Sequence, residues 1–431
     1  MKALLIYLSD SKPSITISLF RFFFSLVLLF QSIYFISGEF INENIIKPVL
    51  LFPFFDNITP LAKPTLITLS YVMLVSNIGM LFNKTARICT ITFCICFTYF
   101  WLLDKGYFNN HYYFISLMCF LLILVEKKSS FTNTILTPSI SILSLQLMVF
   151  IVYFVSGLNK LNPYWLFDLQ PMKHILEVKC DITSNTFFIN PMLIFIMTYL
   201  GVIFDLCVGF LLLFKKTRAF AFILVCIFHG FNYYLFRDVG EIGIFPFIMI
   251  STLILFLDPV KIDDLIISKS IKTNQKVNIK YSSIFMKFIL IFMLLQCLLP
   301  FRHYLFKGYV DYNGVGQRFS WRMKLMFKEV NVQYFITDMR TKKKYETNIA
   351  TMLTPKQYNN LKYFPDLIVP VAKKIKDIAK NKNGMIYTKI TCDYNIQFMG
   401  NQTQKLFNPN LDLSKVSHHT LENRWIIPLK E

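Results

Sequence analysis

Long apolar segments separated by short polar ones fill the first 300 residues of the chain. A helix that crosses the ~30 Å hydrocarbon core of a bilayer needs about 20 apolar residues. Nine segments reach or approach that length and predict about nine transmembrane helices. They lie at about residues 17–37, 64–82, 88–103, 110–125, 136–156, 191–214, 219–236, 242–257 and 283–300. Residues 1–16 lack a small-residue cleavage site and the first apolar segment is long enough to span the bilayer, so no cleavable signal peptide is predicted.

The pattern changes after residue 300, where polar and charged residues mix with apolar ones. Residues 330–336 and 386–390 alternate as strands do. Residues 361–382 have the spacing of one amphipathic helix. We therefore predict a polytopic α-helical membrane domain over residues 1–300 and one compact, β-rich domain over residues 301–431.

Composition supports a membrane protein. Hydrophobic residues make up 55% of the 431 residues and charged residues only 16%, against about 25% charged residues in an ordinary soluble domain. The formal net charge of +20 raises nucleic-acid binding as a first thought. Membrane proteins also concentrate lysine and arginine in their loops, so no nucleic-acid partner is predicted.

The distribution of basic residues predicts the orientation in the membrane. The N-terminus and loops 83–88, 126–131, 215–218 and 259–281 carry 14 lysines and arginines, whereas the alternate loops carry 7. The positive-inside rule makes the first set cytoplasmic. Nine spans then place the C-terminal domain on the non-cytoplasmic side, a periplasm or a lumen.

Lys160 directly follows one of the apolar segments. One interpretation is a lysine that runs along lipid and places its ammonium group at the interface. The other is burial that favours the neutral amine, which then acts as a general base near neutral pH. Asn159 and Asn162 could orient this amine without adding charge. The residues alone leave both interpretations open.

A second polar cluster precedes the apolar segment 110–125. Asn110 could be the N-cap of this helix, with His111 in its first turn. The positive end of a helix disfavours a charged histidine, and a neutral imidazole can hydrogen-bond to a developing oxyanion. Capping and chemistry are equally open here.

Other polar residues lie inside the apolar segments. Asp205, His229 and Asn232 are costly there, and such residues generally have a functional or a paired role. His229 and Asn232 are three residues apart and share a helix face. Asp205 could equally pair with a basic group to hold helices together. Arg21, at the start of the first segment, is interpreted as a topology anchor.

Known short motifs narrow the chemistry. Nine cysteines occur without a CxxC pair or zinc-ligand spacing, so no metal is predicted. A Cys180–Cys392 disulfide is conceivable but has no support. The chain has no P-loop, HExxH, GxSxG or Gly-rich dinucleotide motif, which argues against an ATPase or a metalloprotease of the usual type.

These clusters, in their order along the chain, resemble the vitamin K-dependent γ-glutamyl carboxylase family, whose helical part belongs to the HTTM group. The resemblance covers nearly the whole chain. It is carried by Phe20-Arg-Phe22, Leu103-Asp-Lys105, Asn109-Asn-His111, Gly157-Leu-Asn-Lys-Leu-Asn162, Trp165, Pro171-Met172, Phe204-Asp205, Phe210, His229, Asn232, Leu235-Phe236, Leu299-Pro-Phe-Arg-His303, Gly308, Phe319-Ser-Trp-Arg-Met323, Asn408-Pro-Asn-Leu-Asp412 and Trp425-Ile-Ile-Pro428.

The resemblance implies a reaction. Lys160 would deprotonate vitamin K hydroquinone, whose anion reacts with O₂ to give a stronger base. That base removes the γ-proton of a glutamate in a peptide or protein, the carbanion adds CO₂, and vitamin K leaves as its epoxide. His111 and Asn110 would stabilise oxyanions, and no metal is implied. The substrate or quinone site would further include Asn109, Asn159, Trp165, Asp205, His229, Asn232, Arg302, His303 and Trp321.

Some positions depart from the family pattern. Loop 237–241 looks about four residues longer than usual, and Tyr233 replaces a common serine. Leu50 replaces the cysteine that animal enzymes bridge to their soluble domain. The chain ends soon after Trp425, which argues against a propeptide-directed substrate with many glutamates. The alternative function is a non-enzymatic quinone- or lipid-binding or transport protein on the same scaffold.

Overall fold

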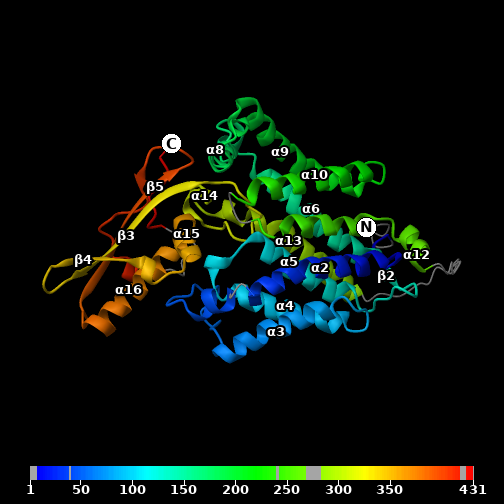
Figure 1. Cartoon of the computed structure of the whole chain (residues 1–431), viewed down its shortest axis with the longest axis horizontal. Helices are drawn as coiled ribbons and strands as arrows, with labels where there is room; N and C mark the ends of the chain where they lie inside the picture. Colours follow the sequence, from blue (N-terminus) through cyan, green and yellow to red (C-terminus); the bar gives the residue numbers. More distant parts are fainter. Residues whose placement is uncertain (1–6, 38–39, 239–241, 268–282, 418–423, 431) are drawn as a thin grey trace.

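A computed structural model describes residues 7–37, 40–238, 242–267, 283–417 and 424–430. A body of long helices occupies one end of the molecule, and a twisted sheet with two helices forms the other (Figure 1). The predicted loops 237–241 and 259–281 fall partly outside the described residues. The helices of the body are α2 (Ile15–Ser37), α3 (Lys63–Gly79), α4 (Ala86–Leu102), α5 (Asn110–Val125), α6 (Ser139–Asn159), α7 (Pro163–Leu166), α8 (Met172–Thr183), α9 (Pro191–Leu213), α10 (Arg218–Phe236), α11 (Phe245–Ser251), α12 (Pro259–Ile267) and α13 (Ser283–Leu298).

Five helices among the described residues are long and apolar enough to cross a membrane, or six if a bent pair counts as one span. The five cover Ile15–Ile36, Ser139–Asn159, Pro191–Leu213, Arg218–Phe236 and Ile284–Leu305. The prediction of nine spans is thus not confirmed, although a helix lies at each predicted segment. Helices α3, α4 and α5 have only 17, 17 and 16 residues, about 25 Å at 1.5 Å per residue. The helix in the eighth segment, Phe245–Phe256, meets the next helix, Pro259–Ile267, at an angle of 89°.

Helices α6 and α9 pack closely, which brings Lys160 near Asp205. Gly157 of α6 permits this close approach. A Cβ atom at this position would lie only 2.9 Å from the backbone nitrogen of Leu206 in α9. Helices α9 and α10 lie at the edge of the body (Figure 1) and leave much of their apolar surface exposed. The helical body therefore has a tightly packed inner layer and an outer pair of helices with exposed apolar surface.

Arg21 is a buried connector instead of the expected topology anchor. Its side chain is fully buried, and Nε lies 3.0 Å from Oε2 of Glu126, the C-cap residue of α5. Nη2 donates to Asn83 Oδ1 at 2.7 Å, and Ser18 donates to Glu126 at 2.8 Å. The expectation was wrong because the Arg21 guanidinium group pairs with the buried Glu126 carboxylate inside the protein and does not extend to the membrane surface.

The C-terminal part is a four-stranded antiparallel sheet of order β4-β3-β5-β6, packed against helices. Tyr334 and Ile390 of the sheet share a core with Leu361 and Ile375 of the helices. Its elements are α14 (Val310–Asn313), β3 (Lys328–Asp338), β4 (Lys344–Thr347), α15 (Pro355–Tyr363), α16 (Ile368–Asn383), β5 (Thr388–Phe398) and β6 (Gln404–Lys405). The predicted alternation at residues 330–336 is confirmed within β3.

Two expectations for this part were wrong. The single helix over residues 361–382 is divided into α15 and α16, because Pro365 begins a 3₁₀ turn between them. The part as a whole is a mixture of helix and sheet and is not largely β.

No disulfide links Cys180 to Cys392, since both thiols are free.

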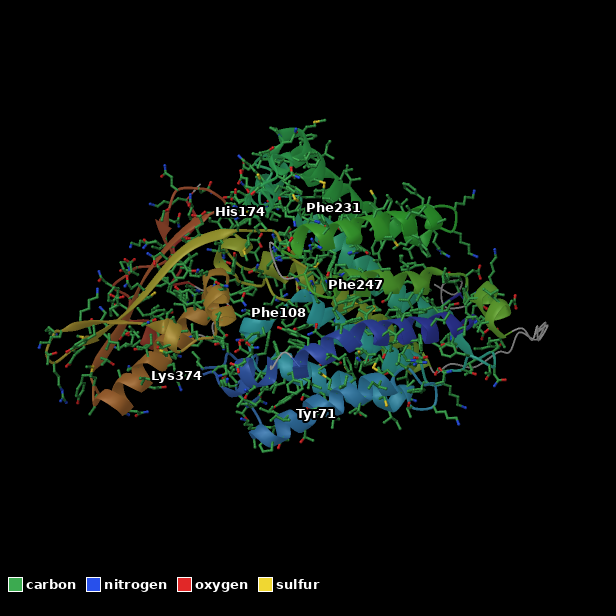
Figure 2. The ribbon with its side chains drawn as sticks, in the orientation of Figure 1. Tyr71, Phe108, His174, Phe231, Phe247 and Lys374 are labelled. Carbon is green, nitrogen blue, oxygen red and sulfur yellow. The ribbon has the colours of Figure 1, made fainter. Side chains whose placement is uncertain are left out.

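Helix α15 ties the C-terminal part to the helical body. Buried Asp104 accepts hydrogen bonds from Gln357 Nε2 and from the backbone of Gly106, both at 2.6 Å. The hydroxyl groups of Tyr107 and Thr354 are 2.6 Å apart. Burial raises the pKa of the Asp104 carboxyl to about 7. Figure 2 marks Phe108 at this junction, directly before α5. The start of α5 is therefore held by both parts of the molecule.

Candidate functional site

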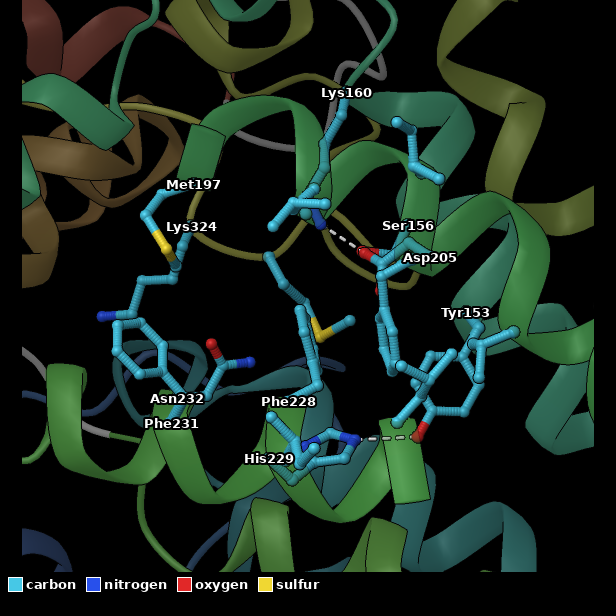
Figure 3. A pocket seen from close by; sticks show the side chains of 18 of the residues that line it. Tyr153, Ser156, Lys160, Met197, Asp205, Phe228, His229, Phe231, Asn232 and Lys324 are labelled. Carbon is cyan, nitrogen blue, oxygen red and sulfur yellow. Dashed lines mark hydrogen bonds and ion pairs between the residues drawn. The ribbon is translucent and has the colours of Figure 1, made fainter. Parts of the chain in front are cut away.

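Lys160 ends helix α6 and is buried, with 7% of its surface exposed. Its Nζ donates to Asp205 Oδ2 of α9 (Figure 3), and lies 5.3 Å from the centre of the Trp165 ring. An interfacial lysine that places its ammonium in water is therefore the wrong interpretation. The expectation that Asn159 and Asn162 orient the Lys160 amine is also wrong. Asn159 donates to Ser320 O, and Asn162 caps α7. An acidic partner stabilises the charged form of a lysine.

This pair borders a cavity of about 630 Å³ lined mainly by residues of α6, α9 and α10. We call it the apolar cavity because most of its lining is Leu, Ile, Val, Met and Phe. Its polar, charged or polar-tipped lining residues are His111, Tyr153, Ser156, Lys160, Trp165, Asp205, His229, Asn232 and Lys324. The predicted residues Lys160, His111, Trp165, Asp205, His229 and Asn232 are thus brought together.

A second polar pair lines the apolar cavity (Figure 3). Tyr153 Oη lies 2.7 Å from His229 Nε2, and both residues are buried. In the described part of the chain, His229 Nδ1 has no hydrogen-bond partner. If the phenol donates to Nε2, the neutral imidazole carries its proton on Nδ1. His229 Nδ1 is then a buried donor without a partner among the described residues. Tyr153 was not predicted from the sequence.

His111 lies at the start of α5, half-buried, with its ring stacked on Phe245 at 4.3 Å between centroids and 8° between planes. The capping residue is Asn109, whose Oδ1 accepts from Tyr112 N at 2.8 Å. The expectation that Asn110 caps this helix was wrong by one position. Asn110 instead donates to the backbone oxygen of Arg322 at 3.1 Å.

The segment from Phe319 to Lys324 joins α5 to the end of α6. Asn159 donates to Ser320 O at 2.8 Å, and its Oδ1 accepts from Arg322 Nη1 at 2.8 Å. Phe319, Trp321 and Lys324 have φ of 63°, 53° and 52°, which costs conformational energy in non-glycine residues. The two asparagine contacts hold this strained segment against both helices.

Several predicted site residues support this segment and do not line the apolar cavity. Trp321 is fully buried and stacks on Tyr113 at 5.2 Å. Arg302 Nη1 donates to Ser320 Oγ at 3.0 Å. His303 Nδ1 lies 2.9 Å from the Pro300 carbonyl oxygen. These three residues and Asn159 therefore support the structure around the site. None of the four lines either cavity, although substrate contact was expected of them.

A second cavity of about 640 Å³ lies between the start of α5, residues 317–326 and α15. We call it the basic cavity because its charged lining residues are Arg318, Arg322, Lys324 and Lys356, with no acidic residue among the described lining. Asn109 and Asn110 also line it. His111, Met323 and Lys324 line both cavities, so the two adjoin at His111. Sequence reasoning missed Arg318, Lys324 and Lys356 as site residues.

The described residues contain no group of three or more His, Cys, Asp or Glu side chains that could hold a metal ion. Residues 11–260 match the family model described as HTTM domain. Residues 281–431 match the model described as vitamin K-dependent gamma-carboxylase, lumenal domain. No solved structure matches the chain.

Proposed function

The chain belongs to the HTTM family and, with its matching lumenal domain, to the vitamin K-dependent gamma-carboxylases, and from this premise we propose that it is a working carboxylase and epoxidase. It oxidises vitamin K hydroquinone to the epoxide with O₂ and converts a glutamate side chain to γ-carboxyglutamate with CO₂. The observation that carries the proposal is the buried Lys160–Asp205 pair on the wall of a large apolar cavity.

The apolar cavity fits a quinone with a hydrocarbon tail. Ligand sites of 300–1,000 Å³ are mostly apolar with a few placed polar groups, and this one has about 630 Å³. The unpartnered His229 Nδ1 suits one ring oxygen, and the Lys160–Asp205 pair suits a hydroxyl group. Bound there, vitamin K hydroquinone supplies with O₂ the strong base that the reaction needs.

Lys160 and Asp205 together can hold and release one proton. The observed contact joins an ammonium to a carboxylate. Transfer of that proton to Asp205 gives a neutral amine and a neutral acid. Nζ can then accept a proton from a hydroxyl group of the substrate. The ion pair is thus compatible with Lys160 as a general base, with Asp205 as the group that takes its first proton.

His111 stands where the two cavities meet. Its ring orientation is fixed by the stack on Phe245, and Asn110 beside it is fixed by Arg322. A preorganised hydrogen-bonding group stabilises charge that develops in the transition state. His111 and Asn110 therefore stabilise negative oxygen atoms formed between the hydroquinone and the glutamate. The active site and C-terminal domain face the non-cytoplasmic compartment in this proposal.

The test is formation of vitamin K epoxide by membranes that contain the wild-type chain or Lys160→Ala. We expect a loss of roughly 100-fold or more, since general base catalysis contributes that much. Lys63→Ala, at an exposed lysine of α3, is the matched control and should retain the rate. Equal epoxide formation by wild type and Lys160→Ala would show that Lys160 is not the base.

A non-enzymatic quinone-binding or transport role is the second candidate. The same ion pair favours it, because a buried Lys–Asp contact also holds two helices together. Mass spectrometry for γ-carboxyglutamate in cells supplied with vitamin K separates the two candidates. Retained quinone binding without CO₂ incorporation into any glutamyl peptide would support the non-enzymatic role.

A further inference from the structure

Arg318 has an unused hydrogen-bonding edge at the wall of the basic cavity. Its side chain is nine-tenths buried, with Nη1 donating to Asp366 Oδ2 at 2.7 Å. The guanidinium group lies over the ring of Phe364, 4.4 Å from the centroid. Nε and Nη2 are buried and have no hydrogen-bond partner among the residues that the structure describes. One side of the group is therefore fixed, and the two donors on the other side are unsatisfied within the described chain.

Buried donors without partners are costly, at about 1–3 kcal/mol for each group and more when it is charged. Nε–H and one N–H of Nη2 point in parallel along one edge of a guanidinium group. This edge matches the two oxygens of a carboxylate, which accepts both bonds at once. The ion pair with Asp366 and the contact with Phe364 hold the edge in one orientation, so little entropy is lost when a ligand binds.

The surroundings of this edge select an anion. Arg322, Lys324 and Lys356 line the same cavity. Arg322 is already paired with Asp311, with Nε 2.7 Å from Oδ1. A single free edge suits a planar carboxylate better than a phosphate, whose third oxygen would need another donor of this kind. Asn110 Oδ1, also unpartnered within the described chain, adds an acceptor for a peptide N–H.

We propose that Arg318 binds the side-chain carboxylate of the glutamate substrate in the basic cavity, through Nε and Nη2. The inference rests on the proposed function and specifies its second substrate site. Because the two cavities adjoin at His111, a glutamate bound in the basic cavity lies next to the apolar cavity. The γ-carbon loses a proton to the base formed from the hydroquinone, and the electron pair left on it forms the new bond to CO₂. The guanidinium charge offsets the negative charge that builds up beside the carboxylate.

The experiment compares Arg318→Lys and Arg318→Gln with wild type in two assays on the same membranes. CO₂ incorporation gives the KM for a short glutamyl peptide, and epoxide formation gives the KM for vitamin K hydroquinone. Arg318→Lys retains the positive charge but not the two parallel donors. A lost charge-assisted pair contributes about 1.5–3 kcal/mol, so we expect the peptide KM to rise roughly 10- to 100-fold in both variants. The hydroquinone KM should stay within about twofold.

Asp366→Asn is the matched variant, because it weakens the ion pair but leaves the free edge intact. Its peptide KM should rise less than that of Arg318→Lys. An unchanged peptide KM in both Arg318 variants overturns the inference, and so does a parallel rise of both KM values, which would mean that the cavity wall has moved. Neither result affects the proposed function, whose own failure would appear as absence of epoxide formation by the wild type. Glutamyl peptide binding, measured by calorimetry on wild type and Arg318→Gln, then still tests the carboxylate site.

Discussion

The two cavities of this protein have nearly the same volume, about 630 and 640 Å³, and opposite chemistry. In the apolar cavity the charges of Lys160 and Asp205 compensate each other. In the basic cavity the charged residues of the described lining are all positive, and Arg318 has two donors without a partner among the described residues. In the proposed function, the first cavity therefore selects a ligand by shape and proton exchange, and the second selects one by charge.

The boundary between the cavities depends on a few backbone contacts. Asn110 and Asn159 bind the segment that contains Ser320 and Arg322. This fixes the start of α5 relative to the end of α6. His111 and Lys160 are therefore positioned by the same segment, although one borders both cavities and the other only the apolar one. Such a segment can remain in a strained conformation because these contacts over-determine it.

Asp205→Asn should have the largest effect on the contrast between the cavities. The substitution leaves the Lys160 charge buried without its carboxylate, which costs about 3–5 kcal/mol for a buried pair. It also removes the group that takes the lysine proton. We expect epoxide formation to fall roughly 100-fold or more and the thermal unfolding temperature of the purified protein to fall as well.

Asp238→Asn is the control for this variant. Asp238 pairs with Lys179 at 2.6 Å, outside both cavities and partly exposed, so its loss should leave epoxide formation near the wild-type rate. If Asp205→Asn behaved like Asp238→Asn, the apolar cavity would not depend on its internal charge pair.

Tyr153→Phe should have a smaller effect that is confined to the apolar cavity. It removes the partner of His229 Nε2, so the imidazole no longer has a fixed tautomer and Nδ1 is no longer held as a donor. A hydrogen bond of this kind contributes about 1 kcal/mol. We expect the hydroquinone KM to rise roughly fivefold while the KM for a glutamyl peptide stays unchanged.

Tyr71→Phe, at an exposed tyrosine of α3 (Figure 2), is the control and should match wild type in both assays. Equal changes of both KM values in Tyr153→Phe would contradict separate substrate sites in the two cavities.

The polar residues of the apolar cavity were largely predictable from the sequence, whereas the charged residues of the basic cavity were not. Lys160, Asp205 and His229 are visible because ionisable residues are rare in or beside apolar segments. Arg318 lies in a polar stretch where one more arginine carries no signal, and only the fold shows that two of its donors are unused. Tyr153 resembles any other aromatic residue of a membrane helix. The exchange of roles between Asn109 and Asn110 arises because either residue satisfies the capping pattern.

The fold shows the same limit. Alternation found β3, since one of its faces is buried. Apolar length found the position of every predicted membrane helix but not the number of spans. Whether a helix of 16 or 17 residues crosses the bilayer depends on its neighbours, and the bend before α12 is not visible in composition.

The last expected effect concerns stability and not catalysis, and it is a pH dependence that arises beside the basic cavity. Burial raises the pKa of Asp104 from 3.8 to about 7. Between these values the folded protein binds a proton that the unfolded chain has released, so this contribution to stability falls as pH rises from about 4 to about 7. Asp104 holds Gln357 of α15, a helix that lines the basic cavity. Asp104→Asn should remove this dependence, which has a slope of at most about 1.4 kcal/mol per pH unit.

Lys328 of β3 should produce the opposite slope in the neighbouring pH range. Burial lowers the pKa of its amine from 10.5 to about 7, and Nζ donates to the backbone oxygen of Tyr363, which also lines the basic cavity. Between about 7 and 10 the unfolded chain binds the extra proton, so stability rises with pH. Thermal unfolding of the purified protein from pH 4 to pH 10 should therefore show one limb that Asp104→Asn flattens and another that Lys328→Met flattens. Tyr153→Phe should leave both limbs unchanged, because both titrating groups support the wall of the basic cavity and neither touches the apolar one. If either limb persisted in its own variant, that group would not be its source.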